Sequence, residues 1–239
     1  MTEHVRWIKL PAKIARHKHA QPYAAVVMSG SYEEAGESGR WRVSAGEVLI
    51  HPAFSAHCDR VSRKGTRVLD IPLAHDQVPR TTCGHIQDPD ALARIAERDP
   101  AAATHYLIAE LRPAHRDATD LELPDQLAAT LNSDAPPDSI ARWAAERGIA
   151  RETLSRQFRA LYEVSAARYR IEARARRAWS AIVTSNIPLA TLAQACGYAD
   201  QAHLTRDVAV LTGRTPGAWR SARSQIFKTT IETAPKLGE

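Results

Sequence analysis

Two stretches near the C-terminus repeat one helical pattern of apolar residues. In each, apolar positions fall 8, 5 and 4 residues before a glycine, which is the spacing of one helix face. The glycines are Gly148 and Gly197, and a sharp corner between helices often requires the positive φ that glycine reaches cheaply. The apolar positions are Ile140, Trp143, Ala144, Leu189, Leu192 and Ala193. Each copy therefore predicts a helix, a turn and a second helix.

The second helix of each copy carries a polar face beside its apolar one. It begins near Arg151 in the first copy and near Gln201 in the second. The inward positions are Leu154, Phe158 and Leu161, then Leu204, Val208 and Leu211. Polar and basic side chains on such a helix can hold phosphates or contact base edges in a DNA groove. The residues predicted to contact DNA are Arg151, Glu152, Ser155, Arg156, Arg159, Gln201, His203, Thr205 and Arg206.

The two copies lie about 50 residues apart, and the order of their segments resembles a known family. The segments are IARWAAERGIARETLSRQF from residue 140, PLATLAQACGYADQAHLTR from residue 188 and LTGRTPGAWR from residue 211. With them, residues 123–220 resemble the DNA-binding domain of the AraC/XylS family of bacterial transcription regulators. The resemblance implies seven helices, two of which are recognition helices that enter successive major grooves of double-stranded promoter DNA.

A long helix is predicted between the two copies, from Ser165 to about Ser185. Its roughly 21 residues would span about 31 Å. Half-sites one turn apart on B-DNA are separated by about 34–36 Å. Residues 142–177 contain ten arginines and four glutamates. A solvated helix face is the simpler explanation of such a run, but its place between two recognition helices favours phosphate contact.

Two positions depart from the family's pattern. Ala150 stands where the first recognition helix usually has a serine cap, so we expect a helix start weaker by about 1 kcal/mol. Asp207 follows Arg206, where the family commonly has an aromatic residue, and a carboxylate facing DNA repels phosphate. We therefore expect the second copy to contribute less affinity than the first, or to require a particular base step.

The first 85 residues have the pattern of short strands separated by turns. β-Branched and aromatic residues cluster at 23–29, 41–43, 48–50 and 67–71, with glycine or proline between them. This pattern predicts a β-barrel or a double-sheet jelly roll. A strand that ends at Gly30, an HxH pair before it and a later histidine resemble a cupin, the sensory half of many AraC-type regulators. The predicted fold class is α+β with two domains: a cupin-like barrel, then an all-α domain with two helix-turn-helix motifs.

The histidines of this barrel have two explanations. An effector pocket is predicted at His17, His19, Tyr23 and His57. Metal-binding cupins use an HxH pair, a glutamate about four residues on and a later histidine, but Tyr23 and Ala24 stand where that glutamate belongs. Three imidazoles could still hold Zn²⁺ or Fe²⁺, with Glu33 or Glu34 as a fourth ligand. The favoured explanation is that these histidines line a pocket or cap strand ends, so no cofactor is expected. We assign no role to the remaining candidates, His51, His75, Cys58, Cys83 and His85.

Between the barrel and the DNA-binding domain, the sequence predicts two helices and a linker. Asp88–Glu97 and Asp99–Leu111 are predicted helices with aspartate near each start, and Arg112–Asp120 a polar linker. Asp138 is the predicted N-cap of the first helix-turn-helix. The predicted divisions are a cupin-like sensing domain at 1–85, a helical connector and linker at 86–120, the DNA-binding domain at 121–225 and a flexible tail at 226–239.

Composition and charge indicate the expected cellular location, the state of the cysteines and the part of the chain that carries the positive charge. No apolar run approaches the roughly 18 residues of a membrane span, and the N-terminus does not resemble a signal peptide, so a cytoplasmic, nucleoid-associated bacterial protein is expected. The three cysteines form no CxxC, which predicts reduced thiols. Residues 121–228 have a net charge of +5 and residues 1–120 of +1, so the positive excess lies with the helix-turn-helix units.

The resemblance and the charge together imply a transcriptional regulator, an activator or a repressor, that a small molecule in the barrel controls. Its expected partners are promoter DNA and the effector, with RNA polymerase and a second copy of the chain as further candidates. The main alternative is a metal-dependent cupin oxygenase or isomerase that carries a DNA-binding domain; we expect no enzyme. A ligand-free architectural DNA-binding protein is the third interpretation.

Overall fold

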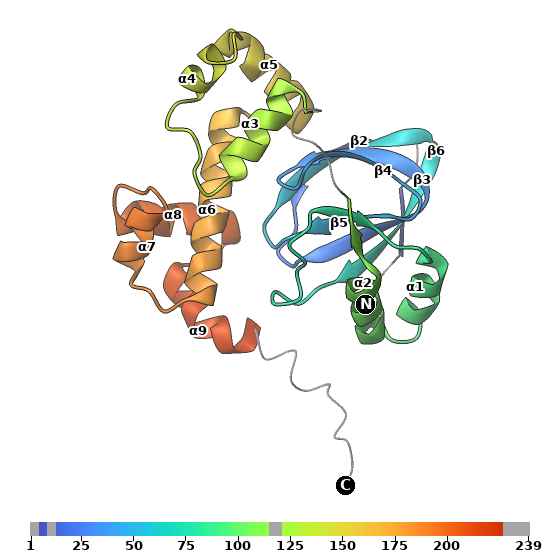
Figure 1. Cartoon of the computed structure of the whole chain (residues 1–239). Helices are drawn as coiled ribbons and strands as arrows, with labels where there is room; N and C mark the ends of the chain where they lie inside the picture. Colours follow the sequence, from blue (N-terminus) through green and yellow to red (C-terminus); the bar gives the residue numbers. More distant parts are fainter. Residues whose placement is uncertain (1–4, 9–12, 115–120, 227–239) are drawn as a thin grey trace.

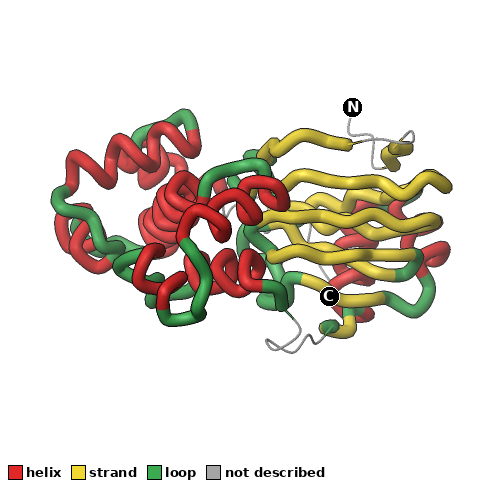
Figure 2. The backbone as a smooth tube through the Cα atoms, turned by 90° about the horizontal axis from the view of Figure 1, so that it is seen from above, coloured by secondary structure: helices red, strands yellow, loops and turns green. Residues whose placement is uncertain are grey.

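The computed structural model describes residues 5–8, 13–114 and 121–226. The chain builds an antiparallel sheet domain first and a helical domain second, and the two lie side by side (Figure 1). Figure 2 shows most strands gathered at one end of the molecule and most helices at the other. The predicted class, α+β with a sheet-rich domain followed by a helix-turn-helix domain, is confirmed.

Within the described residues, eight strands form one curved sheet, in the order β1-β6-β3-β5-β7-β8, with β2 added on β6 and β4 on β3. The two longest strands are β3 and β6, with 14 and 17 residues, and they pair with each other. The bounds are β1 Val5–Ile8, β2 Lys13–Lys18, β3 Tyr23–Gly36, β4 Gly39–Ser44, β5 Glu47–His51, β6 Ala56–Pro72, β7 Cys83–His85 and β8 Arg112–Pro113. All four predicted strand segments lie within these elements.

Side-chain alternation along β3 separates two hydrophobic cores. Ala24 and Val26 face α1 and α2, whereas Tyr23, Ala25 and Val27 face the interior of the curved sheet. The register of β3 against β6 shifts twice, between Val27 and Ser29 and between Gly30 and Tyr32. The first shift leaves Met28 as one extra residue on β3 and so reverses the alternation. Tyr32 accordingly lies in the same interior core as Tyr23. The second half of β3 therefore turns its even-numbered side chains inward.

The prediction that a strand ends at Gly30 is wrong. Gly30 has φ +78°, and a Cβ there would lie 1.8 Å from the carbonyl oxygen of Gly65 on β6. The glycine permits this close approach, so the strand bends and continues to Gly36.

Two short helices cover one face of the sheet: α1 Pro89–Ala96 and α2 Pro100–Glu110. The carboxylates of Asp88 and Asp99 cap them by accepting backbone N–H groups of the first turn, as the sequence predicted. Leu92 and Leu107 complete the core beneath them. The linker prediction is wrong at its start, because Arg112 and Pro113 form β8 and pair with β7. Residues 115–120 lie outside the described residues.

The helical domain contains seven helices among the described residues, the number that the family resemblance implied. One of them, α6, runs through the middle of the domain (Figure 1). The bounds are α3 Leu123–Asn132, α4 Ile140–Ala145, α5 Arg151–Tyr162, α6 Ala166–Thr184, α7 Leu189–Ala195, α8 Gln201–Thr212 and α9 Pro216–Ile226. Among the described residues no helix is long and apolar enough to cross a membrane. The predicted flexible tail falls, from residue 227 on, outside the described residues.

Candidate nucleic-acid interface

The first helix-turn-helix consists of α4 and α5, joined by a turn at Gly148. This glycine has φ +66° with open space where a side chain would point, so the positive φ is the reason for glycine. Leu154 and Phe158 bury the inner face of α5 against Tyr169 of α6. The N-cap of α4 is Ser139, whose Oγ accepts the backbone N–H of Arg142 at 3.3 Å, and not Asp138 as predicted.

The outer face of α5 carries the side chains predicted to contact DNA. These side chains are exposed in the structure: Arg151, Glu152, Ser155, Arg156 and Arg159. They line a concave surface of about 850 Å³ that continues onto the start of α6 at Ser165 and Ala167. Ala150 precedes the helix without a side-chain cap, as expected. The first recognition helix therefore presents its whole polar face to solvent.

The second helix-turn-helix consists of α7 and α8, joined by a turn at Gly197 with φ +72°. Asp200 caps α8 by accepting the backbone N–H of His203 at 2.7 Å. Gln201 and Arg206 are exposed, and His203 and Thr205 are half-buried. All four predicted residues thus lie on the first two turns of α8, but with unequal access to solvent.

His203 and Asp207 of α8 are held by α6. Nη2 of Arg174 donates to Oδ2 of Asp207 at 3.2 Å and lies 3.4 Å from Nε2 of His203. The Arg174 guanidinium also lies 4.1 Å from the centre of the Tyr198 ring. The expectation that Asp207 faces DNA as a bare carboxylate therefore needs correction: its charge is paired with Arg174 within the protein.

Helix α6 joins the two modules by sharing its buried face between two cores. Ala166 and Tyr169, near its start, belong to the core of the first module, and Trp179 and Ile182, near its end, to that of the second. The helix begins after Ser165 and ends at Thr184, close to the predicted bounds, and its 19 residues span about 28 Å. Both modules are thus fixed to one rigid element.

The arginines of α6 serve contacts within the chain more than the sequence suggested. Arg176 pairs with Glu37, and Arg168 with Glu172 at 2.8 Å. Arg177 donates to the carbonyl oxygen of Leu131 at 3.2 Å. The basic excess available for phosphate therefore lies mainly on α5 and not along the connecting helix.

A family comparison agrees with this geometry. Residues 143–222 match a family model described as a helix-turn-helix domain, a range that runs from α4 to α9 and includes both recognition helices. The chain carries an AraC-type DNA-binding domain.

Several solved structures resemble parts or most of this chain. A transcriptional regulator with an AraC-type DNA-binding domain from Chromobacterium violaceum is 24% identical over 40% of this chain and 85% of its own, with a TM-score of 0.37. ToxT from Vibrio cholerae, bound to an unsaturated fatty acid, is 9% identical over 91% and 93%, with a TM-score of 0.40. The DNA-binding domain of AdpA in complex with a target DNA is 21% identical over 45% and 98%, also at 0.40. No curated protein matches the sequence.

In the sheet domain, the structure brings the predicted pocket residues together and adds others. We call this group the histidine cluster: His17, His19, Tyr23, Glu34, His51, His57 and Asp59. Ring centroids of neighbouring histidines and Tyr23 lie 4.3–5.6 Å apart. His51, which the sequence analysis assigned no role, stacks on Tyr23 at 4.4 Å. Glu33 points away from the cluster, toward Arg40 and Arg60.

Strand register explains why these residues meet. His17 lies opposite His57 across β2 and β6, Tyr23 opposite His51, and Glu34 opposite Asp59. Residues directly opposite in an antiparallel pair point to the same face. Gly36 lies opposite His57, and a Cβ at Gly36 would come within 2.7 Å of the His57 Cβ. A glycine is therefore required for the histidine to fit.

Two buried carboxylates set the charge of His57. Nδ1 of His57 lies 3.0 Å from Oε2 of Glu34 and 3.4 Å from Oδ1 of Asp59. Burial lowers the pKa of His57, but the attraction of both carboxylates outweighs burial and raises the pKa to about 10. The Tyr23 hydroxyl lies 3.3 Å from Nε2 of the same ring. The cluster is thus a polar centre inside an otherwise apolar sheet.

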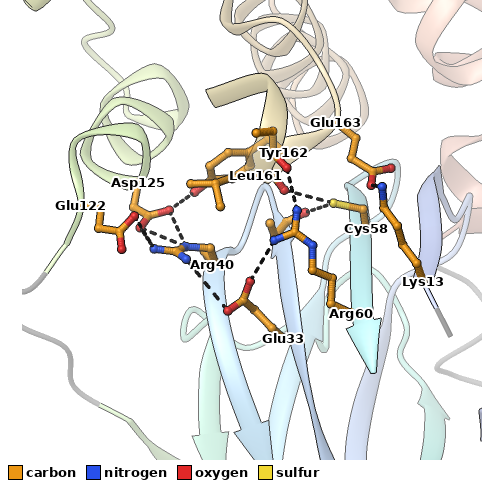
Figure 3. A network of polar contacts seen from close by, with 12 residues as sticks. Lys13, Glu33, Arg40, Cys58, Arg60, Glu122, Asp125, Leu161, Tyr162 and Glu163 are labelled. Carbon is orange, nitrogen blue, oxygen red and sulfur yellow. Dashed lines mark hydrogen bonds and ion pairs between the residues drawn. The ribbon is translucent and has the colours of Figure 1, made fainter. Parts of the chain in front are cut away.

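The sheet domain is fastened to the first helix-turn-helix by polar contacts (Figure 3). Arg40 of β4 donates to both oxygens of Asp125 on α3 at 2.8–3.1 Å, and the Tyr162 hydroxyl donates to the same carboxylate at 2.8 Å. Nη2 of Arg60 donates to the carbonyl oxygen of Ala160 at 2.6 Å. The last turn of α5 is therefore tied to β4 and β6.

Contacts to the second half of the helical domain come from β2 and from the segment before β6. Phe54, which is 4% exposed, packs edge-on against Trp179 and Trp219 at 4.9 and 5.7 Å. Arg16 donates to Glu172 at 3.0 Å, and Lys18 donates to the carbonyl oxygen of Leu211 at the end of α8. His17 of the histidine cluster stands between these two basic residues in the sequence.

Proposed function

We propose that the regulator reads duplex DNA with α5 and α8 together, each in one major groove. The observation that carries the proposal is the pair of solvent-facing recognition helices, both packed on α6, with the basic side chains Arg151, Arg156, Arg159 and Arg206 exposed. Exposed arginines can hold phosphates and pair with guanine through two hydrogen bonds. The span of α6, about 28 Å, is near the 34–36 Å that separates half-sites one turn apart.

The experiment is a gel-shift titration of the full chain on a specific site selected from random duplexes. Arg156→Ala should weaken specific binding by about 1–3 kcal/mol if the guanidinium pairs with guanine. Arg98→Ala removes the same charge from an exposed position in the sheet domain and should leave the affinity unchanged. Equal affinities for the Arg156→Ala variant and the wild type would remove Arg156 from the DNA contacts.

We further propose that a small effector binds in the sheet domain, at the pocket of His17, His19, Tyr23 and His57, and thereby changes DNA affinity. The supporting observation is that one strand, β2, reaches both the pocket and the helical domain. It carries His17, and the residues on either side of His17, Arg16 and Lys18, contact α6 and α8. A ligand that binds two arrangements of β2 unequally would bias the helical domain. Compounds that raise the melting temperature should also change the gel-shift Kd; compounds that bind the cluster and leave Kd unchanged would contradict effector control.

A further inference from the structure

The histidine cluster contains two groups of donors that share one residue. His17, His19 and His57 form one group, and Glu34, His51 and His57 form the other. In each group the donor atoms all lie within 4.8 Å of one another. Four residues with nitrogen or carboxylate donors, His17, His19, Glu34 and His51, thus converge around the imidazole of His57.

The second group is enclosed. Glu34, His51 and His57 are 1%, 2% and 3% exposed, so the surrounding sheet shields them from water. They come from three different strands, β3, β5 and β6. Glu34 and His57 have paired strand neighbours on both sides, and His51 pairs with Tyr23 of β3. Strand positions of this kind hold their side chains more precisely than loop positions do.

The donor set selects a class of ligand. Imidazole nitrogens combined with one carboxylate suit Zn²⁺ and Fe²⁺, whereas Mg²⁺ and Ca²⁺ prefer oxygen donors alone. Donors around a tetrahedral ion, with bonds of about 2.0–2.1 Å, lie about 3.4 Å apart. Donors within 4.8 Å of one another reach that spacing through shifts on the order of 1 Å, within the range of side-chain rotation. Asp59, whose Oδ1 lies 3.4 Å from Nδ1 of His57, is placed to orient that ring.

We propose that the histidine cluster binds one divalent first-row transition metal ion, with Glu34, His51 and His57 as its central ligands. His17 and His19 add two imidazoles at the half-buried side of the same site. The proposal rests on the effector pocket proposed above and names the chemistry of the ligand that this pocket takes. These ligands differ from the metal ligands considered from the sequence, which did not include His51 and left the carboxylate open between Glu33 and Glu34.

The test is metal binding by the full chain after treatment with a chelator. Zn²⁺ is titrated by calorimetry, and Co²⁺ is added separately because its visible absorption reports tetrahedral coordination by nitrogen and oxygen. We expect one equivalent to bind, and Glu34→Gln and His57→Gln each to weaken binding at least tenfold, in line with the loss of a ligand. His105→Gln, which changes an exposed histidine on α2, should bind as the wild type does.

Circular dichroism of each variant checks that it is folded, and the Co²⁺ spectrum of the wild type tests the site without any substitution. Absence of a stoichiometric Co²⁺ or Zn²⁺ complex in the wild type would overturn the proposal, as would equal binding by folded Glu34→Gln and His57→Gln. DNA affinity measured on the same samples keeps the two proposals apart. Intact DNA binding without metal binding removes only the metal site, and metal binding with unchanged DNA affinity supports the site but contradicts effector control.

Discussion

At the scale of single residues, the two recognition helices start differently. Asp200 caps α8 through a hydrogen bond of 2.7 Å to the backbone N–H of His203, whereas Ala150 offers α5 no side-chain acceptor. The first N–H groups of a helix have no partner within it, so a missing cap costs stability. The two modules therefore provide a matched pair of positions at which to measure that contribution.

We predict opposite effects from substitutions at these caps. Asp200→Ala should lower the free energy of unfolding by about 1 kcal/mol because the α8 cap is lost. Ala150→Ser should raise it by about 0.5–1 kcal/mol because a hydroxyl can accept an N–H of the α5 start. Urea unfolding of both variants measures the change, and an Ala150→Ser protein less stable than the wild type would contradict the prediction.

Residue-level prediction from sequence worked where the signal was local. The turn glycines Gly148 and Gly197 and the exposed face of α5 follow from helical spacing alone. His51 was missed because its place in the cluster depends on its partner across the sheet, Tyr23, and pairing is not written in neighbouring residues. Asp207 was misjudged for the same reason, since its partner Arg174 lies 33 residues away.

At the scale of elements, α6 is the part on which the two modules depend. Its first half packs into one core and its second half into another, so a break between them would separate the modules. Ser180 lies on its exposed side, near the end of the helix. A substitution there can disturb the backbone without removing a buried side chain.

Ser180→Pro should destabilise the protein by about 3 kcal/mol or more, because proline removes one hydrogen bond of α6 and clashes with the preceding turn. Ser180→Ala keeps the helix and should change stability by less than about 0.5 kcal/mol. Thermal unfolding compares the two. Equal stability of the proline and alanine variants would mean that α6 is not continuous at this point.

Among the elements, helices were predicted more accurately than strands. The starts of α5 and α8 and both ends of α6 agree with the sequence prediction to within about two residues, because caps and helical periodicity are short-range signals. The predicted strand ended at Gly30, whereas β3 continues to Gly36. From the sequence alone, a glycine that permits close approach to Gly65 cannot be distinguished from a glycine in a turn. The pairing of Arg112 and Pro113 with β7 left no pattern in the sequence at all.

At the scale of the whole molecule, the sheet domain and the helical domain are joined by packing and by ion pairs. Glu163, at the end of α5, pairs with Lys13 and accepts the backbone N–H of Arg16 at 3.1 Å. The hydrogen bond from Lys13 is the main cause that lowers the pKa of Glu163, and burial opposes it. None of these contacts follows from the sequence, since each joins residues more than 140 positions apart.

The depressed pKa gives the junction a pH dependence of definite sign. The contribution of Glu163 is fully present above the ordinary carboxyl pKa of about 4.3 and is lost as the pH falls through the lower pKa of the folded state. Glu163→Gln should therefore be less stable than the wild type at pH 7, and the difference should shrink as the pH falls below about 4.3. Urea unfolding across this range measures it, with Glu97→Gln as the exposed control; a difference that grows toward low pH would contradict the assignment.

The central claim is that α5 and α8 read two half-sites held in phase by α6. The most direct measurement is a hydroxyl-radical footprint of the full chain on its selected duplex, with Arg156→Ala and Arg206→Ala beside the wild type. We predict two protected segments centred about 10–10.5 base pairs apart, with Arg156→Ala weakening one and Arg206→Ala the other. A single protected segment, or one that both variants weaken alike, would contradict the claim.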